Sequence, residues 1–75
     1  MQTITSSRDL GKLIRGERRV QGLTQEQLAG LTGVGARFVR ELEAGKESCQ
    51  LGRALQVAAA LGLNLSVSSR QEIAR

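Results

Sequence analysis

The 75-residue chain carries 11 lysines and arginines against 7 acidic residues, a net charge of +4, with one cysteine and no histidine. One cysteine excludes an intrachain disulfide, and the lack of histidine leaves no ligand set for a structural zinc ion. A chain of this length is near the lower limit for burying a stable core alone, so self-association is the remaining aid. We expect one domain whose basic balance suits a polyanionic partner.

The sequence offers no catalytic constellation. Ser66, Ser68 and Ser69 have no histidine to activate a nucleophile, and the carboxylates fall on helical surfaces. No apolar run approaches the roughly 18 residues of a membrane span, and the N-terminus lacks the apolar centre of a signal peptide. We therefore predict a non-enzymatic, cytoplasmic binding module without a cofactor, a metal or a small-molecule effector.

Glycine provides the breaks between predicted helices, because the chain contains no proline. A first helix is predicted over about residues 8–21, with Ser6 or Ser7 as its N-terminal cap. Gly22 is expected to end it in the left-handed conformation. Its expected apolar stripe consists of Leu10, Leu13, Ile14 and Val20.

The second helix has a clear start. Thr24 and Gln27 have the spacing of a capping box, in which each side chain satisfies an orphan backbone amide. Leu23, just before the cap, is expected to pack against Leu28 as a hydrophobic staple. The helix is predicted to end just before Gly33, which takes the left-handed cap position.

Two further helices follow. The third is predicted to begin after Gly35, a weak N-terminal cap, and to stop at Gly45, with Val39 and Leu42 facing the core. The fourth, over about residues 51–61, is the most apolar helix of the chain. The stripe expected to be buried on it consists of Leu51, Leu55, Ala58 and Leu61, flanked by Ala54 and Val57.

After Gly62 the apolar period changes from 3.6 to 2. Leu63, Leu65 and Val67 alternate with polar residues, which is the pattern of a half-buried strand. A single strand cannot satisfy its own backbone groups, and no second strand is predicted in the chain. We expect residues 63–68 to pair with the same segment of a second copy; the alternative is one more helical turn followed by disorder.

Residues 24–46 read TQEQLAGLTGVGARFVRELEAGK, two helices joined by a short glycine-containing turn, which is a helix-turn-helix arrangement. In such a unit the first helix aims its amino end at a phosphate while the second lies in the major groove. Small residues are needed where the two helices approach, and Ala29 and Gly33 are expected to supply them.

The run TQEQLA, then GVG, then a helix ending in LEAGK resembles the XRE or lambda-repressor-like helix-turn-helix family over about residues 8–62. The resemblance implies a mainly α fold, a compact bundle of four to five helices, and sequence-specific binding to double-stranded DNA. The chain departs from the family pattern at Gly35, where serine or threonine is frequent, and has alanine at Ala36, the first reading position.

The segment ALGLNLSVSSR resembles the end of HipB-type antitoxins, small regulators of this fold that finish in a short strand. That resemblance implies a homodimer paired through its strands, repression of its own operon at an inverted-repeat operator, and binding of a HipA-like kinase toxin. It also implies association with the bacterial nucleoid when bound to DNA. The expected organisation is a flexible lead over 1–7, a DNA-binding domain over 8–62, a dimerisation strand over 63–68 and a tail over 69–75.

The expected DNA-contacting residues form two sets. Those expected to read bases are Ala36, Arg37, Phe38, Arg40 and Glu41. Those expected to contact phosphate are Thr24, Gln25, Arg18, Arg19 and Lys46. The resemblance to the family supports Gln25, Ala36, Arg37, Glu41 and Lys46 in these roles. Contacts between two subunits are expected at Leu63, Leu65 and Val67.

Simpler interpretations stay open for several of these residues. Arg37 and Arg40 also fit as solvated charges, with Glu41 or Glu43 on the same helix as partners. Phe38 is either a core residue or an apolar contact to DNA. At the level of function, the alternatives are a stand-alone or phage-type repressor without a toxin, and an interaction adaptor that keeps the fold but has lost DNA binding.

Overall fold

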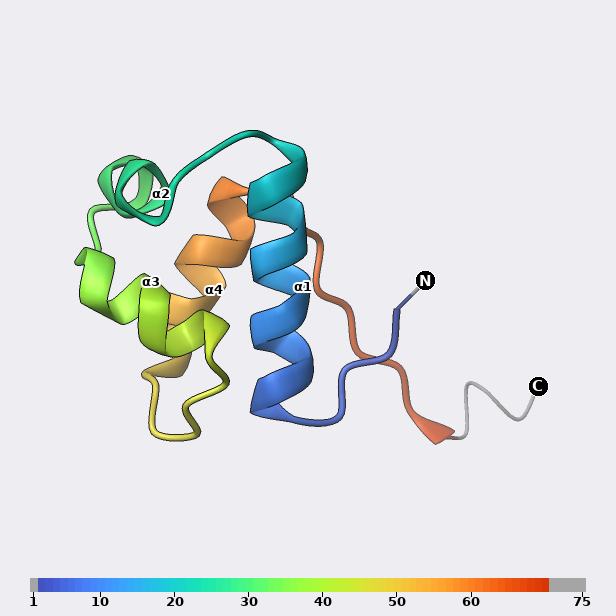
Figure 1. The fold of residues 1–75 in the computed structure, drawn as a ribbon. Helices are drawn as coiled ribbons and strands as arrows, with labels where there is room; N and C mark the ends of the chain where they lie inside the picture. The colour runs from blue at the N-terminus through green and yellow to red at the C-terminus, as the bar shows by residue number, and fades with distance from the viewer. Residues whose placement is uncertain (1, 71–75) are drawn as a thin grey trace.

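The computed structural model describes residues 2–70, which contain four helices. These are α1 (Ser7–Val20), α2 (Gln25–Thr32), α3 (Ala36–Glu43) and α4 (Leu51–Ala60). α1 packs against α3, and α2 packs against both α3 and α4, so that the helices surround one core (Figure 1). The predicted mainly α bundle with a helix-turn-helix is confirmed.

The core is aliphatic and draws on every helix. The largest fully buried side chains are Ile14, Leu28, Val39 and Val57, one from each helix. Smaller contributions around them come from Ala29, Leu42, Ala54, Ala58 and Leu61. Because each helix supplies at least one fully buried residue, separating any one helix from the others would open a cavity in the same core.

The helix ends follow the chemistry predicted from the sequence. Ser6 caps α1 by accepting a hydrogen bond from the amide of Asp9 at 3.0 Å. Thr24 and Gln27 form the complete capping box at the start of α2, each side chain accepting from the other residue's amide. Gly33 ends α2 with φ +77°, the left-handed region that favours glycine.

The buried face of α4 matches the expected one only in part, since Ala58 and Leu61 are buried as predicted but two leucines are not. Leu51 and Leu55 are 68% and 44% exposed, whereas the buried residues are Ala54, Val57, Ala58 and Leu61. This helix is apolar around most of its circumference, so two stripes of helical period fit its sequence. The small side chains of the observed stripe permit close packing against α2, and the longer leucines are left outside.

The buried face of α1 is also rotated from the prediction. Val20 is 80% exposed, and the face turned inward contains Gly11, Ile14 and the largely buried Arg18. Gly11 explains the rotation, because a Cβ there would lie 2.5 Å from the carbonyl oxygen of Leu42 on α3. The close approach between helices thus occurs at Gly11. It does not occur at Gly33, where an added Cβ would meet no atom within 4 Å.

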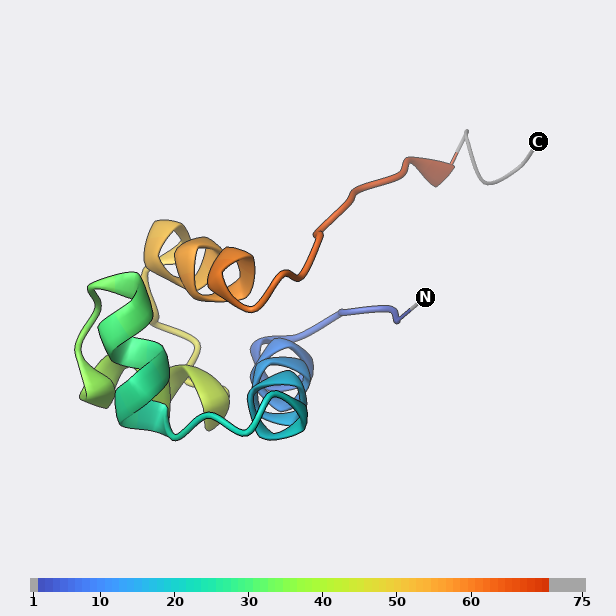
Figure 2. The ribbon, with the colours of Figure 1, turned by 90° about the horizontal axis from the view of Figure 1, so that it is seen from above.

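Residues 63–69 form no strand in the described part of this single chain. They lead away from the end of α4 as an extended segment (Figure 2). Leu63 packs against the core, whereas Leu65 and Val67 are exposed. The expected tail lies mostly outside the described residues. Within residues 2–70, no helix has the length and apolar character needed to cross a membrane.

Candidate nucleic-acid interface

α2 and α3 are joined by the turn at residues 33–35, and the two faces of α3 have different environments. One face is buried and carries Val39, Leu42 and Glu43. The opposite face presents Arg37 and Arg40, whose side chains are 84% and 53% exposed. The core therefore fixes the rotation of α3 about its axis, and that rotation directs two guanidinium groups into solvent.

The other expected base-reading residues are less exposed. Ala36 and Phe38 are half-buried and pack against the core cluster, so each presents only part of its surface outward. Glu41 is partly exposed at the end of the same helix. The five expected residues therefore all lie on α3. Among the three charged ones, Arg37 has the most exposed side chain.

Glu41 is the common partner of two cations. Its Oε2 atom lies 3.4 Å from Nε of Arg37, one turn earlier, and 3.1 Å from Nζ of Lys46. The hydrogen bond from Lys46 lowers the pKa of the Glu41 carboxyl, and the charge of Arg37 adds to this effect. In the free protein, Glu41 thus holds a candidate base-reading residue and a candidate phosphate contact close to one carboxylate.

Arg40 has a different partner from the one expected. Its Nη1 lies 3.9 Å from Oε2 of Glu26 on α2, rather than pairing along its own helix with Glu41 or Glu43. The contact is long and both side chains are exposed, so it contributes little to stability. It does link the exposed faces of the two helices of the helix-turn-helix.

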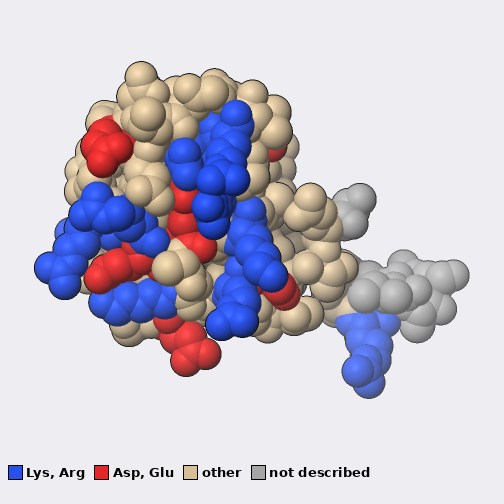
Figure 3. Space-filling model, in the orientation of Figure 1, with Lys and Arg blue, Asp and Glu red and all other residues tan. Residues whose placement is uncertain are grey.

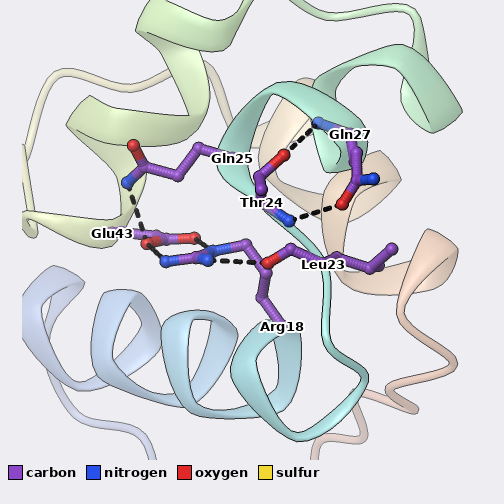
Figure 4. Close-up of polar contacts among 6 residues, drawn as sticks. All are labelled: Arg18, Leu23, Thr24, Gln25, Gln27 and Glu43. Carbon is purple, nitrogen blue, oxygen red and sulfur yellow. Dashed lines mark hydrogen bonds and ion pairs between the residues drawn. The ribbon is translucent and has the colours of Figure 1, made fainter.

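A buried polar network ties α1 to this unit (Figure 4). Glu43 on α3 accepts two hydrogen bonds from Arg18, from Nε at 2.6 Å and from Nη2 at 2.9 Å. Nη1 of Arg18 also donates to the carbonyl oxygen of Leu23 at 2.8 Å, and Nε2 of Gln25 donates to Oε1 of Glu43 at 3.1 Å. Burial raises the pKa of the Glu43 carboxyl, but the bonds from Arg18 and Gln25 lower it by more, so its net pKa lies below the ordinary value.

This network changes the interpretation of two residues. The side chain of Arg18 is only 11% exposed and its guanidinium donates to Glu43 and to the carbonyl oxygen of Leu23, so little of it is left to meet a phosphate. Glu43 was not predicted as a buried residue. The sequence did contain a signal, since Arg18 lies four residues after the buried Ile14 and Glu43 four residues after the buried Val39, which places each on an inward face.

Of the remaining expected phosphate contacts, three lie at the edge of an open groove, and Lys46 is not among the residues that line it. Thr24, Gln25, Arg19 and Arg40 line it, together with Arg15 and Arg18. Lysine and arginine side chains cover much of the face over α1 and α3, with acidic side chains between them (Figure 3). The amino end of α2 opens into this groove, where its backbone amides favour an anion.

Comparisons with known proteins agree with this geometry. The sequence pattern of the family described as Helix-turn-helix matches residues 14–67. A curated protein of Sinorhizobium fredii, the uncharacterized HTH-type transcriptional regulator y4mF, is 45% identical over 64 residues, which cover 85% of this chain and 84% of that protein.

Solved structures share the fold. A HipA-HipB-O2-O3 complex contains a chain that superposes with a TM-score of 0.85 at 21% identity, over 93% of this chain and 99% of that chain. A HipB-O4 20mer complex gives a TM-score of 0.84 at 21% identity, over the same shares of the two chains. At this identity the likeness establishes the common fold.

Proposed function

We infer the function from one premise: this chain belongs to the XRE-type helix-turn-helix family of DNA-binding transcriptional regulators. That family is not one of enzymes. We propose that the protein is a sequence-specific repressor that acts as a homodimer and places α3 of each subunit in the major groove. The observation that supports this most strongly is the orientation of α3, whose inward face is buried while Arg37 and Arg40 project from the other.

In the proposed complex the base-reading residues are Ala36, Arg37, Phe38, Arg40 and Glu41. Arg37 is the principal reader, because an exposed guanidinium near the start of the recognition helix is able to donate two hydrogen bonds to O6 and N7 of guanine. Ala36 and the exposed part of Phe38 suit apolar contact with a thymine methyl group. Glu41 suits the amino group of cytosine when Arg37 turns away from it toward DNA.

The proposed phosphate contacts surround this helix. Thr24 and Gln25 stand at the amino end of α2, where the helix dipole also favours a phosphate. Arg19 borders the same groove, and Lys46 follows α3. These contacts would position the protein on the duplex and leave sequence discrimination to α3.

Dimerisation is proposed through residues 63–68. Leu65 and Val67 are exposed in the single chain, and the extended backbone around them has free hydrogen-bonding capacity that a second copy would satisfy. Leu63, which packs against the core, would connect the paired strands to the helical domain of its own subunit. Two-fold symmetry then predicts an inverted-repeat operator with half-sites about one helical turn apart, or a multiple of that distance.

We further propose that the protein is the antitoxin of a toxin–antitoxin operon and binds a HipA-like kinase toxin. The support is the shared fold with HipB, one structure of which also contains HipA. A gene for a kinase-like protein beside the gene for this chain, and co-purification of the two products, are the expected findings. A neighbouring gene of another kind would favour a stand-alone repressor instead.

DNA binding is tested by fluorescence anisotropy with the purified chain. Duplexes containing an inverted repeat, selected from a random pool, are compared with shuffled duplexes of equal length and composition. We expect selection to converge on one repeat that binds at least about 10³-fold more tightly than the shuffled control, the lower end for specific regulators. A pool that never converges would contradict sequence-specific binding. No binding at low ionic strength would instead favour an adaptor that has lost DNA binding.

The dimer is tested by sedimentation of the variant Leu65→Pro beside a control variant, Val20→Ser. Proline at residue 65 removes a ladder hydrogen bond and a side-chain contact together, so the dimer should dissociate. Val20→Ser changes an exposed apolar residue outside the proposed strand and should leave the dimer intact. A tight dimer of Leu65→Pro would exclude the strand as the main interface.

A further inference from the structure

Four basic side chains form a single stripe on α1. Their spacing of four, three and four residues brings them within about 60° around the helix, at 3.6 residues per turn. All four are exposed, and the acidic residues of the helix, Asp9 and Glu17, fall outside the stripe. We call this stripe the α1 ridge; its members are Arg8, Lys12, Arg15 and Arg19.

The α1 ridge differs from the other cations near α3 in having no carboxylate partner. In residues 2–70, no ion pair or side-chain hydrogen bond joins a ridge residue to another group, although the charges of Lys12 and Arg15 act on Asp9 and Glu43 at longer range. By contrast, Arg37 and Lys46 are paired with Glu41, and Arg40 is paired with Glu26. A phosphate that meets the ridge therefore displaces only water and counterions.

Both ends of the α1 ridge meet the proposed DNA interface. At the first end, the backbone of Arg8 lies so close to Gly45 that a Cβ built on that glycine would be 2.9 Å from the Arg8 Cα, and Lys46 is the next residue. At the other end, Arg15 and Arg19 line the groove at the amino end of α2. A band of basic side chains follows α1 on the same face as the cations of α3 (Figure 3).

We propose that the α1 ridge is a second, sequence-independent DNA-binding surface, which lies along the phosphodiester backbone beside the half-site read by α3. The proposal rests on the proposed function, since it takes α3 as the base reader. From its first to its last member the ridge extends about 16 Å, at 1.5 Å per residue. That length spans about five base pairs, which carry about five phosphate charges on the strand beside the ridge, and a regular row of cations without acidic neighbours suits such a polyanion.

The test compares Arg8→Gln/Lys12→Gln with a matched control, Arg53→Gln, which removes an exposed arginine from α4. Binding to the selected operator and to a shuffled duplex is measured by anisotropy over a series of salt concentrations. The double variant should lose affinity by the same factor on both duplexes, so that the specificity ratio is unchanged. Its plot of log affinity against log salt concentration should be shallower by about two units per subunit, one for each lost phosphate contact.

Arg53→Gln should leave both affinity and salt slope at the wild-type values. On operator duplexes trimmed outside the repeat, the salt slope of the wild type should become shallower by at least as much as that of the double variant, because the whole ridge then loses the phosphates beside the half-site. A double variant with wild-type affinity and slope would overturn the proposal. Wild-type protein that binds neither duplex would overturn the proposed function itself.

Discussion

The guanidinium of Arg18 on α1 and the carboxylate of Glu43 on α3 form a two-point ion pair, with donor–acceptor distances of 2.6 and 2.9 Å. The side chain of Glu43 is only 3% exposed. A third group, the amide of Gln25, donates to the same carboxylate. One buried charge pair thus holds together α1, α3 and the amino end of α2.

Loss of one member of this pair should destabilise the protein strongly. Glu43→Ala leaves the guanidinium of Arg18 buried without its counterion, and we expect a loss of about 3 kcal/mol in the free energy of unfolding, measured with urea. Glu41→Gln is the control, because it removes a partly exposed carboxylate with two cationic partners in solvent and should cost much less than Glu43→Ala. Equal losses in the two variants would contradict the structural role of the buried pair.

The same pair predicts a pH dependence. The pKa of Glu43 is lower in the folded protein than its ordinary value of 4.5, so its stabilising contribution is complete above that value. The contribution is lost as the pH falls through the lowered folded-state pKa, because the carboxyl then takes up a proton. The stability gap between wild type and Glu43→Gln should therefore be constant from neutral pH down to about 5 and shrink in more acidic solution. A gap that stays constant under acid conditions would show that Glu43 does not titrate in this way.

Two glycines on α1 should respond oppositely to alanine. At Gly11 the new methyl group would overlap the carbonyl oxygens of Leu42 and Glu43, so the helices must separate, at a cost of at least about 1–3 kcal/mol. At Gly16 it would meet no atom within 4 Å, and the higher helix propensity of alanine should stabilise the protein by about 0.5–1 kcal/mol. Urea midpoints of the two variants provide the comparison. Changes of the same sign would contradict the close contact at Gly11.

The sequence was sufficient to predict the elements that local chemistry determines. The capping box of Thr24 and Gln27 and the left-handed Gly33 depend on neighbouring residues, so their spacing alone locates the ends of α2. The helix-turn-helix followed from the same signals. The exposed position of Arg37 could be predicted as well, because Val39 and Leu42 identify the inward face of α3.

The features that could not be predicted from the sequence depend on contacts between distant segments. Two stripes fit the apolar α4, and only its packing against α2 decides that Leu51 and Leu55 remain outside. The burial of Glu43 depends on a partner 25 residues earlier in the chain, Arg18. An extended segment such as residues 63–69 becomes a strand only when a second strand meets it, which local sequence does not encode.

The central claim, that α3 reads base edges, is tested most directly with a panel of operator duplexes that each carry one altered base pair. Affinities of the wild type and of Arg37→Ala are measured for every duplex. At one guanine position the wild type should discriminate by about 1–3 kcal/mol, and Arg37→Ala should lose that discrimination there while keeping it elsewhere. If Arg37→Ala retains the wild-type preference at every position, Arg37 does not read the operator and the proposed placement of α3 is contradicted.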